Sequence, residues 1–337
     1  MRAHHTLAYG MGLGYLADLL LGDPRRGHPV AAFGRAAAAA ERGMWRDQRA
    51  AGVRYTALCA GGTVLTAAAL SAVASRAARQ CRGPAALAPA ALTALTTWAA
   101  LGGTSLAREA RYVAAALSEG DLDRARELLP RLCGRDPQAL DADGLARAVV
   151  ESVAENTSDA VVGALVWGAV AGVPGLAGFR AVNTLDAMVG HRSPRHLRFG
   201  WASARLDDAA GLPGSRLGAA LAVAAGPDPR GGVRAWRADA ARHPSPNAGP
   251  VEAAFAGALG VRLGGALSYG GRAEHRPVLN PAGRAVAPAD IERAVRLSRR
   301  VGLLSLLVTT GARPAVAALR ARRSRRAAGP AGPEVRG

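Results

Sequence analysis

The sequence predicts an all-α, polytopic integral membrane protein with several transmembrane helices and polar helical loops. Three segments carry no charged residue at all: 55–75, 83–107 and 160–179. Each provides the roughly 20 residues that a helix needs to cross a bilayer. Strand signals are sparse, because no stretch sustains a two-residue alternation of polar and apolar positions, and aromatic residues make up only 4%.

The composition agrees with this fold class. Apolar residues make up 50% of the chain, and alanine, leucine, valine and glycine dominate them. Small residues let helices approach closely in lipid. A genome rich in G and C produces a similar composition by default, so the composition alone is not sufficient evidence for a membrane protein.

The net charge of +18 suggests a nucleic-acid partner, but the pattern of residues does not. All 43 basic residues are arginine, which codon bias explains, and neither a helix-turn-helix nor a zinc knuckle is present. We therefore expect no nucleic-acid partner. The missing lysine also excludes a Walker A loop, Schiff-base chemistry and lysyl-adenylate ligases. Cys59, Cys81 and Cys133 are scattered, which argues against a zinc site or a disulfide framework.

The order of segments predicts one membrane-embedded catalytic domain over 1–320 and a basic, disordered tail over 321–337. Residues 5–22 form an apolar first helix that is not cleaved, since Asp18 lies inside it. Segments 55–75 and 83–107 form a helical hairpin. Further segments are a soluble helical region over 108–143, a weaker apolar segment over 209–227, a mostly polar helical region over 228–300 and a short last span over 301–319.

The topology stays open at one point. The arginine-rich segment 23–54 and the tail are both expected on the cytoplasmic side of the cell's inner membrane. Pro174 and the glycines around it would bend segment 160–179, which either spans the membrane or re-enters it. The number of spans depends on that choice.

Candidate site residues crowd against this segment. Glu151, Glu155 and Asp159 are spaced i, i+4 and i+8, which places them on one helical face beside Asn156. Like charges in that arrangement repel each other unless a cation or an arginine compensates them. The pattern favours a Mg²⁺ or amine site made of hard oxygen atoms over a solvated helix face.

A second polar group follows the uncharged segment. Asn183 and Asp186 are spaced i, i+3, and either residue alone could be a helix cap. Arg205, Asp207 and Asp208 come next, and an arginine beside paired carboxylates suits phosphate and a metal ion. A plain intramolecular salt bridge is the alternative.

Two further stretches are candidates. In 242–260, prolines stiffen a loop that leads into a helix, Asn247 can cap that helix, and Glu252 falls in its first turn. His243 is either an acid–base group or a structural histidine. Near the N-terminus Asp18, Asp23 and His28 are available, although Asp-Pro is also ordinary turn chemistry.

These segments resemble the cobinamide-phosphate synthase family of cobalamin biosynthesis, called CobD or CbiB. The resemblance covers most of 15–300 and lies in long motifs: DLLLGDPRRGHPV (18–30), GRDPQALD (134–141), RAVVESVAENTSD (147–159), RAVNTLDAMVG (180–190), FGWASARLDD (199–208) and HPSPNAGPVEAAFAGALGVRLGG (243–265). The sequence departs from the family after Gly265, where ALSYGGRAEHRP replaces an Asn/Tyr-rich segment, and in the tail.

The resemblance implies an amide ligation. The family joins a propionate of adenosylcobyric acid to aminopropanol phosphate, or to aminopropanol, with consumption of ATP. Mg²⁺ would serve the phosphoryl transfer. Membrane lipid and other cobalamin-biosynthesis enzymes are the expected surroundings.

We assign expected roles on this basis. The catalytic candidates, for metal, amine and proton transfer, are Glu151, Glu155, Asp159, Asn183, Asp186 and His243. Asp186, Asp207 and Asp208 are the candidate metal ligands. Arg205, Arg25 and Asn247 are the candidate contacts for the phosphates of the co-substrate.

Two other classes of function remain open from the residues alone. A corrinoid transporter, or a membrane scaffold for cobalamin enzymes, would also use charged pairs in the membrane, although no internal repeat is visible. A Mg²⁺-dependent alcohol phosphotransferase is less well supported, because its spaced aspartate signature is missing.

Overall fold

The computed structural model describes residues 3–24, 27–80, 83–138, 140–191, 193–269 and 272–327, with the backbone alone for 3–4, 266–269, 272–275 and 312–327. The fold is helical, as predicted, apart from one β-hairpin. The α-helices are α1 (Ala3–Leu21), α2 (Pro29–Met44), α3 (Arg49–Thr56), α4 (Gly62–Gln80), α5 (Ala88–Ala100), α6 (Gly103–Ser118), α7 (Leu122–Leu128), α8 (Ala142–Thr157), α9 (Gly163–Leu185), α10 (Trp201–Ala225), α11 (Pro229–Asp239), α12 (Ala248–Leu259) and α13 (Ala289–Ala327).

Short 3₁₀ and π-helical turns extend several of these helices. The 3₁₀ turns are Pro84–Leu87, Leu129–Arg131 and Ala240–Arg242, and the π-helical turns are Ala57–Gly61, Ser158–Val162 and Asp186–Gly190. Through the π turns, α3 runs on into α4, and α8 runs on into α9.

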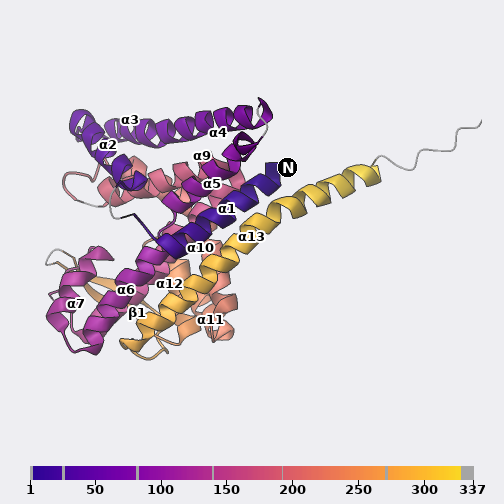
Figure 1. Cartoon of the computed structure of the whole chain (residues 1–337). Helices are drawn as coiled ribbons and strands as arrows, with labels where there is room; N and C mark the ends of the chain where they lie inside the picture. Colours follow the sequence, from indigo (N-terminus) through magenta and orange to yellow (C-terminus); the bar gives the residue numbers. More distant parts are fainter. Residues whose placement is uncertain are drawn as a thin grey trace, which may run out of the picture.

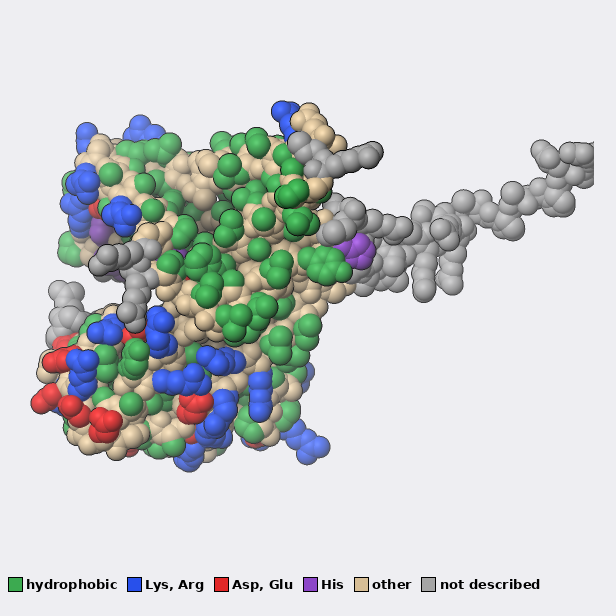
Figure 2. Space-filling model, viewed as in Figure 1, with side chains coloured by type: hydrophobic (Ala, Val, Ile, Leu, Met, Phe, Trp, Pro, Cys, Tyr) green, Lys and Arg blue, Asp and Glu red, His purple; other side chains and the backbone are tan. Residues whose placement is uncertain are grey.

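The molecule has an apolar half and a polar half. In Figure 1, α3 and α4 lie along one edge, α1, α5 and α9 lie beneath them, and α6, α7, α11 and α12 form the opposite part. Figure 2 shows apolar side chains over most of the first part, with basic side chains at its upper left corner, and acidic and basic side chains gathered over the second part. Helix α13 packs against α6, α8 and α10 and also against α1 and α9, so it connects the two halves.

Within the described part of the chain, three helical stretches are long and apolar enough to cross a membrane: Arg49–Gln80, Pro84–Ser118 and Ala142–Gly190. Apart from Gly83 they contain the three uncharged segments of the sequence, so the prediction of these segments is confirmed. Large apolar side chains on α1, α4 and α5 are exposed, among them Leu20, Leu65 and Leu95. Such a surface is stable when lipid covers it.

The third stretch turns back on itself. Gly172, within α9, has φ +66° and ψ −143°, a conformation that glycine adopts easily and that breaks the helix just before Pro174. The two halves then pack together, since a Cβ at Gly163 would collide with the ring of Phe179. A Cβ at Gly175 would likewise collide with the carbonyl oxygen of Trp167. Segment 160–179 is therefore a helical hairpin whose two ends lie together, the geometry expected of a re-entrant segment rather than of a full span, and we call it the re-entrant hairpin.

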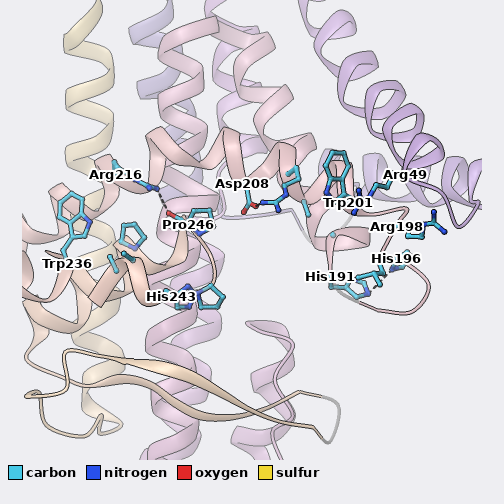
Figure 3. A pocket seen from close by; sticks show the side chains of 18 of the residues that line it. Arg49, His191, His196, Arg198, Trp201, Asp208, Arg216, Trp236, His243 and Pro246 are labelled. Atoms are coloured by element: carbon cyan, nitrogen blue, oxygen red, sulfur yellow. Dashed lines mark hydrogen bonds and ion pairs between the residues drawn. The ribbon is translucent and has the colours of Figure 1, made fainter. Parts of the chain in front are cut away.

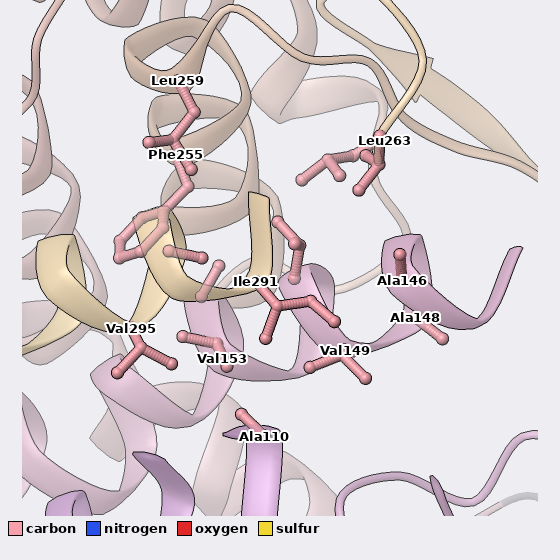
Figure 4. Packing of buried hydrophobic residues seen from close by; sticks show 14 of the residues in the cluster. Ala110, Ala146, Ala148, Val149, Val153, Phe255, Leu259, Leu263, Ile291 and Val295 are labelled. Atoms are coloured by element: carbon pink, nitrogen blue, oxygen red, sulfur yellow. The ribbon is translucent and has the colours of Figure 1, made fainter. Parts of the chain in front are cut away.

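The polar half has its own hydrophobic core. Phe255 and Leu259 from α12 meet Val149 and Val153 from α8 and Ile291 from α13 (Figure 4). All five side chains are buried. Every residue of α12 is buried as well, so this helix is the centre around which the neighbouring helices pack.

The β-hairpin is the one element that the sequence analysis missed, because it treated 228–300 as helical. Strands β1 (Leu263–Tyr269) and β2 (Arg272–Leu279) pair antiparallel, with an irregular register between Leu263 and Gly265. Gly260 ends α12 in the left-handed conformation, with φ +70°, and Gly264 and Gly265 in β1 also have positive φ values. The segment lacks the alternation that usually marks a strand, so its pairing depends on tertiary contacts.

Helix α13 begins at an ion cluster around the buried carboxylate of Asp290. Both carboxylate oxygens of Asp290 accept hydrogen bonds from Arg284, at 2.6 and 2.7 Å. Arg293 donates to the same carboxylate at 2.6 Å, and the amide of Ala287 donates at 2.9 Å. Burial alone would raise the pKa of Asp290, but these hydrogen bonds outweigh it and lower the pKa to about 2.

This cluster predicts how stability depends on pH. Because the pKa of Asp290 is lower in the folded chain than its ordinary value of 3.8, its stabilisation is complete above that value and disappears as the pH falls toward 2. Asp290→Asn should lower the free energy of unfolding by about 1–3 kcal/mol at pH 7. The difference in Tm between the wild type and Asp290→Asn should become smaller as the pH falls from 4 to 2. A difference that stays constant over this range would contradict the assignment.

The re-entrant hairpin predicts a specific membrane topology. Asp143 and Arg198, which are exposed on either side of the hairpin, should lie on one side of the membrane. Gln80, at the end of α4, should lie on the other side. Single cysteines at these positions, in a cysteine-free background, can be labelled with an impermeant maleimide in sealed vesicles. If the cysteines at positions 143 and 198 were labelled from opposite sides of the membrane, segment 160–179 would span it and the prediction would be wrong.

Candidate functional site

Two polar segments meet at the open end of the hairpin. Asp159 precedes the hairpin, and Asn183 and Asp186 follow its return, so the reversal at Gly172 brings them together. Asp159 interacts electrostatically with Glu155, Asp186 and Asp207. Asn183 donates a hydrogen bond to the side chain of Asp207, on α10. The structure thus gathers most of the predicted carboxylates into one group, which we call the acidic cluster: Glu155, Asp159, Asp186, Asp207 and Asp208.

Local geometry places two of these carboxylates in unusual turns. Asp159 lies in the π-helical turn Ser158–Val162, and Asp186 begins the π-helical turn Asp186–Gly190. A π turn inserts one extra residue into a helix and occurs frequently at functional sites. The sequence suggested that Glu151, Glu155 and Asp159 share one helical face at i, i+4 and i+8. Glu151 and Glu155 keep this spacing within α8, whereas Asp159 lies in the π turn that begins at Ser158.

The acidic cluster has an excess of negative charge. Burial, followed by the repulsion from Asp186 and Asp208, raises the pKa of Asp207 to about 7 against the lowering effect of Asn183. The Oδ1 atom of Asp207 is buried and has no hydrogen-bond partner within the described residues. A group of carboxylates in this state favours a bound cation, either a metal ion or an ammonium group.

Arg180 joins the acidic cluster to the N-terminal loop. Its charge interacts with both Asp159 and Asp23, and its Nη1 lies 3.4 Å from Oδ1 of Asn183. Asp23 in turn lies 3.5 Å from Nε2 of His28, whose Nδ1 caps α2 by accepting the amide hydrogen of Val30. The sequence analysis missed Arg180. Its position in the sequence could have identified it. Asp159 and Arg180 flank the uncharged segment 160–179, so a reversal of the chain in that segment places them side by side.

Glu151 occupies a different environment from the acidic cluster. It forms a buried ion pair with Arg135, and its Oε1 accepts the amide hydrogen of Gly264 at 2.7 Å. Its side chain is only 2% exposed. Glu151 therefore ties the loop before α8 and the start of the β-hairpin to α8, and both of its oxygen atoms are engaged.

His243 and Glu252 lie beside this ion pair. Nδ1 of His243 accepts the amide hydrogen of Ser245 at 3.1 Å, so Nε2 faces Glu252 at 3.8 Å and Nη1 of Arg276 at 3.5 Å. Burial, with a contribution from the charge of Arg276, lowers the pKa of His243. Burial and the charges of Glu151 and Glu155 raise the pKa of Glu252. The imidazole is therefore neutral at neutral pH, and Glu252 keeps its proton to a higher pH than an ordinary glutamate does.

Arg135 and Arg276 are further residues that the sequence analysis missed. Both arginines interact electrostatically with Glu155, so they link the acidic cluster to His243 and Glu252. Arg135 stands inside the GRDPQALD motif, which was available as a signal. Arg276 belongs to the unpredicted β-hairpin, so nothing in the local sequence placed it near a carboxylate.

Asn247 is placed to shape α10. Its Nδ2 donates to the backbone carbonyl of Asp208 at 2.9 Å, and its Oδ1 lies 3.4 Å from Nη1 of Arg216. Gly211 permits this approach, because a Cβ there would collide with the Asn247 amide. In this structure Asn247 thus supports the helix that carries Asp207 and Asp208.

Arg205 is exposed and pairs loosely with Asp208 at 3.5 Å. It lines a cavity of about 1030 Å³ beside the acidic cluster, to which Asp208 and His243 also contribute. Figure 3 shows α10 along one wall, with Trp201 and Asp208, and the loop of His243 and Pro246 opposite. Arg25, the other predicted phosphate contact, lies outside the described residues.

The cavity is strongly basic. Among the described residues, its lining has one acidic residue, Asp208, against five arginines and three histidines. The indole of Trp201 stacks under Arg49, with the guanidinium carbon 5.2 Å from the ring centroid. The basic residues are Arg49, Arg198, Arg205, Arg216, Arg237, His191, His196 and His243.

The acidic cluster is not a closed metal centre. Among the described residues, no three histidine, cysteine, aspartate or glutamate side chains converge closely enough to hold a metal ion as they stand. The donor set nevertheless suits Mg²⁺, which prefers carboxylate oxygens and retains several waters or substrate oxygens. The unpartnered Oδ1 of Asp207 is the donor atom that fits best.

The fold and the site define a class: an α-helical membrane protein in which a re-entrant hairpin positions a carboxylate cluster beside a large basic cavity. The family model for the CobD/Cbib protein matches residues 11–298. The chain belongs to the CobD/CbiB family.

Curated relatives agree along nearly their whole length. The chain is 53% identical to "Cobalamin biosynthesis protein CobD" of Mycobacterium tuberculosis (strain CDC 1551 / Oshkosh) over 317 residues, which cover 92% of this chain and 98% of the relative. It is 44% identical to the protein of that name from Chromobacterium violaceum, covering 85% and 90%. For Rhodobacter capsulatus the identity is 40%, covering 86% and 95%. No solved structure matches the chain.

The separation of Glu151 from the acidic cluster can be tested by stability. Removing one partner of a buried ion pair leaves an uncompensated charge, which costs about 3–5 kcal/mol. Glu151→Ala and Arg135→Ala should therefore each lower the thermal stability strongly, while Glu155→Gln should keep it close to that of the wild type. Unfolding followed by near-UV circular dichroism in detergent provides the measurement. Equal losses in all three variants would show that Glu155 is also structural.

Proposed function

We propose that this protein is an adenosylcobinamide-phosphate synthase of cobalamin biosynthesis. It would join the amine of (R)-1-amino-2-propanol phosphate, or of aminopropanol, to a propionate carboxylate of adenosylcobyric acid, with consumption of ATP. The observation that carries the proposal is the continuity between the basic cavity and the acidic cluster, through Asp208, which belongs to both. Family membership and the names of the relatives support it.

The cavity suits the larger substrate. A volume of about 1030 Å³ is at the upper end for ligand pockets and is appropriate for a macrocycle. Trp201 and Trp236 offer flat apolar faces in the lining, and the arginines offer donors for carboxylate and phosphate oxygens. The reacting propionate would point along α10 toward Asp208.

The chemistry requires the carboxylate to be activated. A carboxylate is a poor electrophile, so in the proposed reaction its oxygen attacks the γ-phosphorus of ATP to give an acyl phosphate and ADP. The amine nitrogen then attacks the acyl carbon, the carbon–oxygen bond to phosphate breaks, and the products are the amide, phosphate and a proton. Positioning and charge stabilisation account for most of the catalysis in such phosphoryl transfers.

Different residues of the site would serve the different steps of this ligation. Arg205 and its basic neighbours would hold phosphate oxygens. Asp186, Asp207 and Asp208 would hold Mg²⁺, which neutralises phosphate charge when bound. Glu155 and Asp159 would hold the ammonium group of the amine. His243, which is neutral because of its lowered pKa, is a suitable acceptor for the proton that the amine releases.

The surroundings of the site support a location in the cell's inner membrane with the site on the cytoplasmic side. Exposed arginines gather where the hairpin opens, including Arg49, Arg195, Arg198 and Arg205. Positive charge beside transmembrane segments marks the cytoplasmic side. Nucleotide and phosphorylated amine would reach the cavity from there.

The proposed activity has a direct test. Purified protein in lipid or detergent, given Mg·ATP, adenosylcobyric acid and aminopropanol phosphate, should produce the amide and ADP, both measured by liquid chromatography. Glu155→Gln and Asp207→Asn should each lower the turnover by about 10²-fold or more, because they remove preorganised charge. Asp143→Asn, which changes an exposed carboxylate on the same helix as Glu155, is the matched control and should keep normal turnover.

Two outcomes would contradict the proposal. No product from folded wild-type protein would exclude the ligase. Uptake of the corrinoid into proteoliposomes without amide formation would support the transporter or scaffold instead. Near-normal turnover in both site variants would remove the acidic cluster from the reaction while leaving the activity in place.

A further inference from the structure

We propose that a groove formed by α4, α5 and α9 binds one phospholipid of the surrounding bilayer. The lipid phosphate would lie at Arg79, and one acyl chain would extend along the groove toward the open end of the hairpin. None of the residues that carry this proposal belongs to the acidic cluster or to the basic cavity, and Arg180, which interacts with Asp159, lies only at the inner end of the groove.

Three neighbouring cavities make up the groove. The outer one, of about 720 Å³, includes Arg79, Ser71 and Ser75 from α4. The middle one, of about 470 Å³, shares Leu92 and Val173 with it. The inner one, of about 280 Å³, shares four residues with the middle one: Phe33, Thr63, Thr96 and Ala177. The shared walls make the three cavities one continuous feature.

The length of the groove suits an acyl chain. Along its α5 side the lining runs from Ala86 to Ala100, which is about 20 Å at 1.5 Å per residue. One leaflet of a bilayer contributes about 15 Å of hydrocarbon, half of the total thickness. One turn of a helix from a second protein, about 10 Å wide and 5.4 Å long, occupies about 400 Å³, which exceeds the inner cavity of about 280 Å³. A single hydrocarbon chain is the occupant that fits.

The walls and the surroundings are apolar over most of this length. Ala36, Ala37 and Ala67 line the middle cavity, and Ala177 and Ala181 line the inner one. Leu58, Leu70, Leu87 and Leu95 also line the groove and are exposed at its surface, and Leu65 is exposed on α4 outside it. A chain entering from the lipid would therefore move between two apolar environments.

The outer end of the groove is polar and positively charged. Arg79 lies in the last turn of α4 and is exposed, and within the described part of the chain it forms neither a hydrogen bond nor an ion pair. The hydroxyls of Ser71 and Ser75 line the same cavity. A cation without a counter-charge, beside hydroxyls and at the mouth of an apolar groove, complements the phosphate and the chain of a phospholipid.

Native mass spectrometry of the full chain tests this proposal. The protein is stripped of lipid in detergent and then given dioleoyl-phosphatidylglycerol. The wild type should retain one lipid per chain. Ala177→Trp, which fills the junction of the middle and inner cavities, should reduce the retained lipid more than tenfold, and Arg79→Gln should reduce it several-fold. Arg76→Gln removes an exposed arginine from the same helix but outside the groove, and it should have no effect.

Several results would overturn the proposal. They are no retained lipid on the wild type, equal retention by Ala177→Trp, or full displacement of the lipid by glycerophosphate, which carries the headgroup without a chain. A retained second copy of the protein in place of lipid would also overturn it. Should Ala177→Trp fail to fold, Ala177→Leu and Thr96→Leu narrow the groove with smaller side chains and should each lower the retention.

Discussion

The whole arrangement depends on the reversal of the chain at Gly172. A continuous helix over 160–179 would place Asp159 and Arg180 on opposite faces of the bilayer. The positive φ of Gly172 and the missing Cβ atoms of Gly163 and Gly175 instead let two half-helices pack side by side. The apolar run therefore acts as an anchor that returns the chain to its starting side. The acidic cluster, its partner Arg180 and the wall of the basic cavity all depend on that return.

Charged groups in this protein fall into two kinds with different physical roles. The carboxylates of Glu151 and Asp290 are satisfied by several hydrogen bonds and hold loops and helix ends in place. The acidic cluster is not satisfied in this way, as the unpartnered oxygen of Asp207 illustrates. Charged groups with complete hydrogen bonding stabilise and order the fold, whereas charged groups that lack partners favour the binding of a ligand. In the proposed function, the ligands of the acidic cluster are a metal cation and an amine.

Much of this could be predicted from local sequence. Uncharged runs identified the segments that can cross a membrane, and polar residues beside the run 160–179 identified Glu155, Asp159, Asn183, Asp186 and Asp207, which the structure gathers. The hairpin over 263–279 and the contacts of Arg276 could not be predicted, because they arise from pairing across the fold. Glu151 could not be assigned from sequence for the same reason. Its spacing placed it with Glu155, but only the tertiary structure shows that its carboxylate already binds Arg135 and the amide of Gly264. The predicted roles of these residues in catalysis stay predictions.

The π-helical turns at 158–162 and 186–190 make chain length as important as residue identity. Each turn contains one residue more than an α-helix would, and each residue rotates a helix by about 100°. Loss of a single residue from either turn would restore regular α-helix and turn every side chain beyond it away from its present partners. Substitutions near the acidic cluster can therefore be mild or severe according to the side chain, whereas a deletion of one residue would disassemble the site with its carboxylates still present. In evolutionary terms, insertions and deletions are tolerable in the surface loops but not in these two turns.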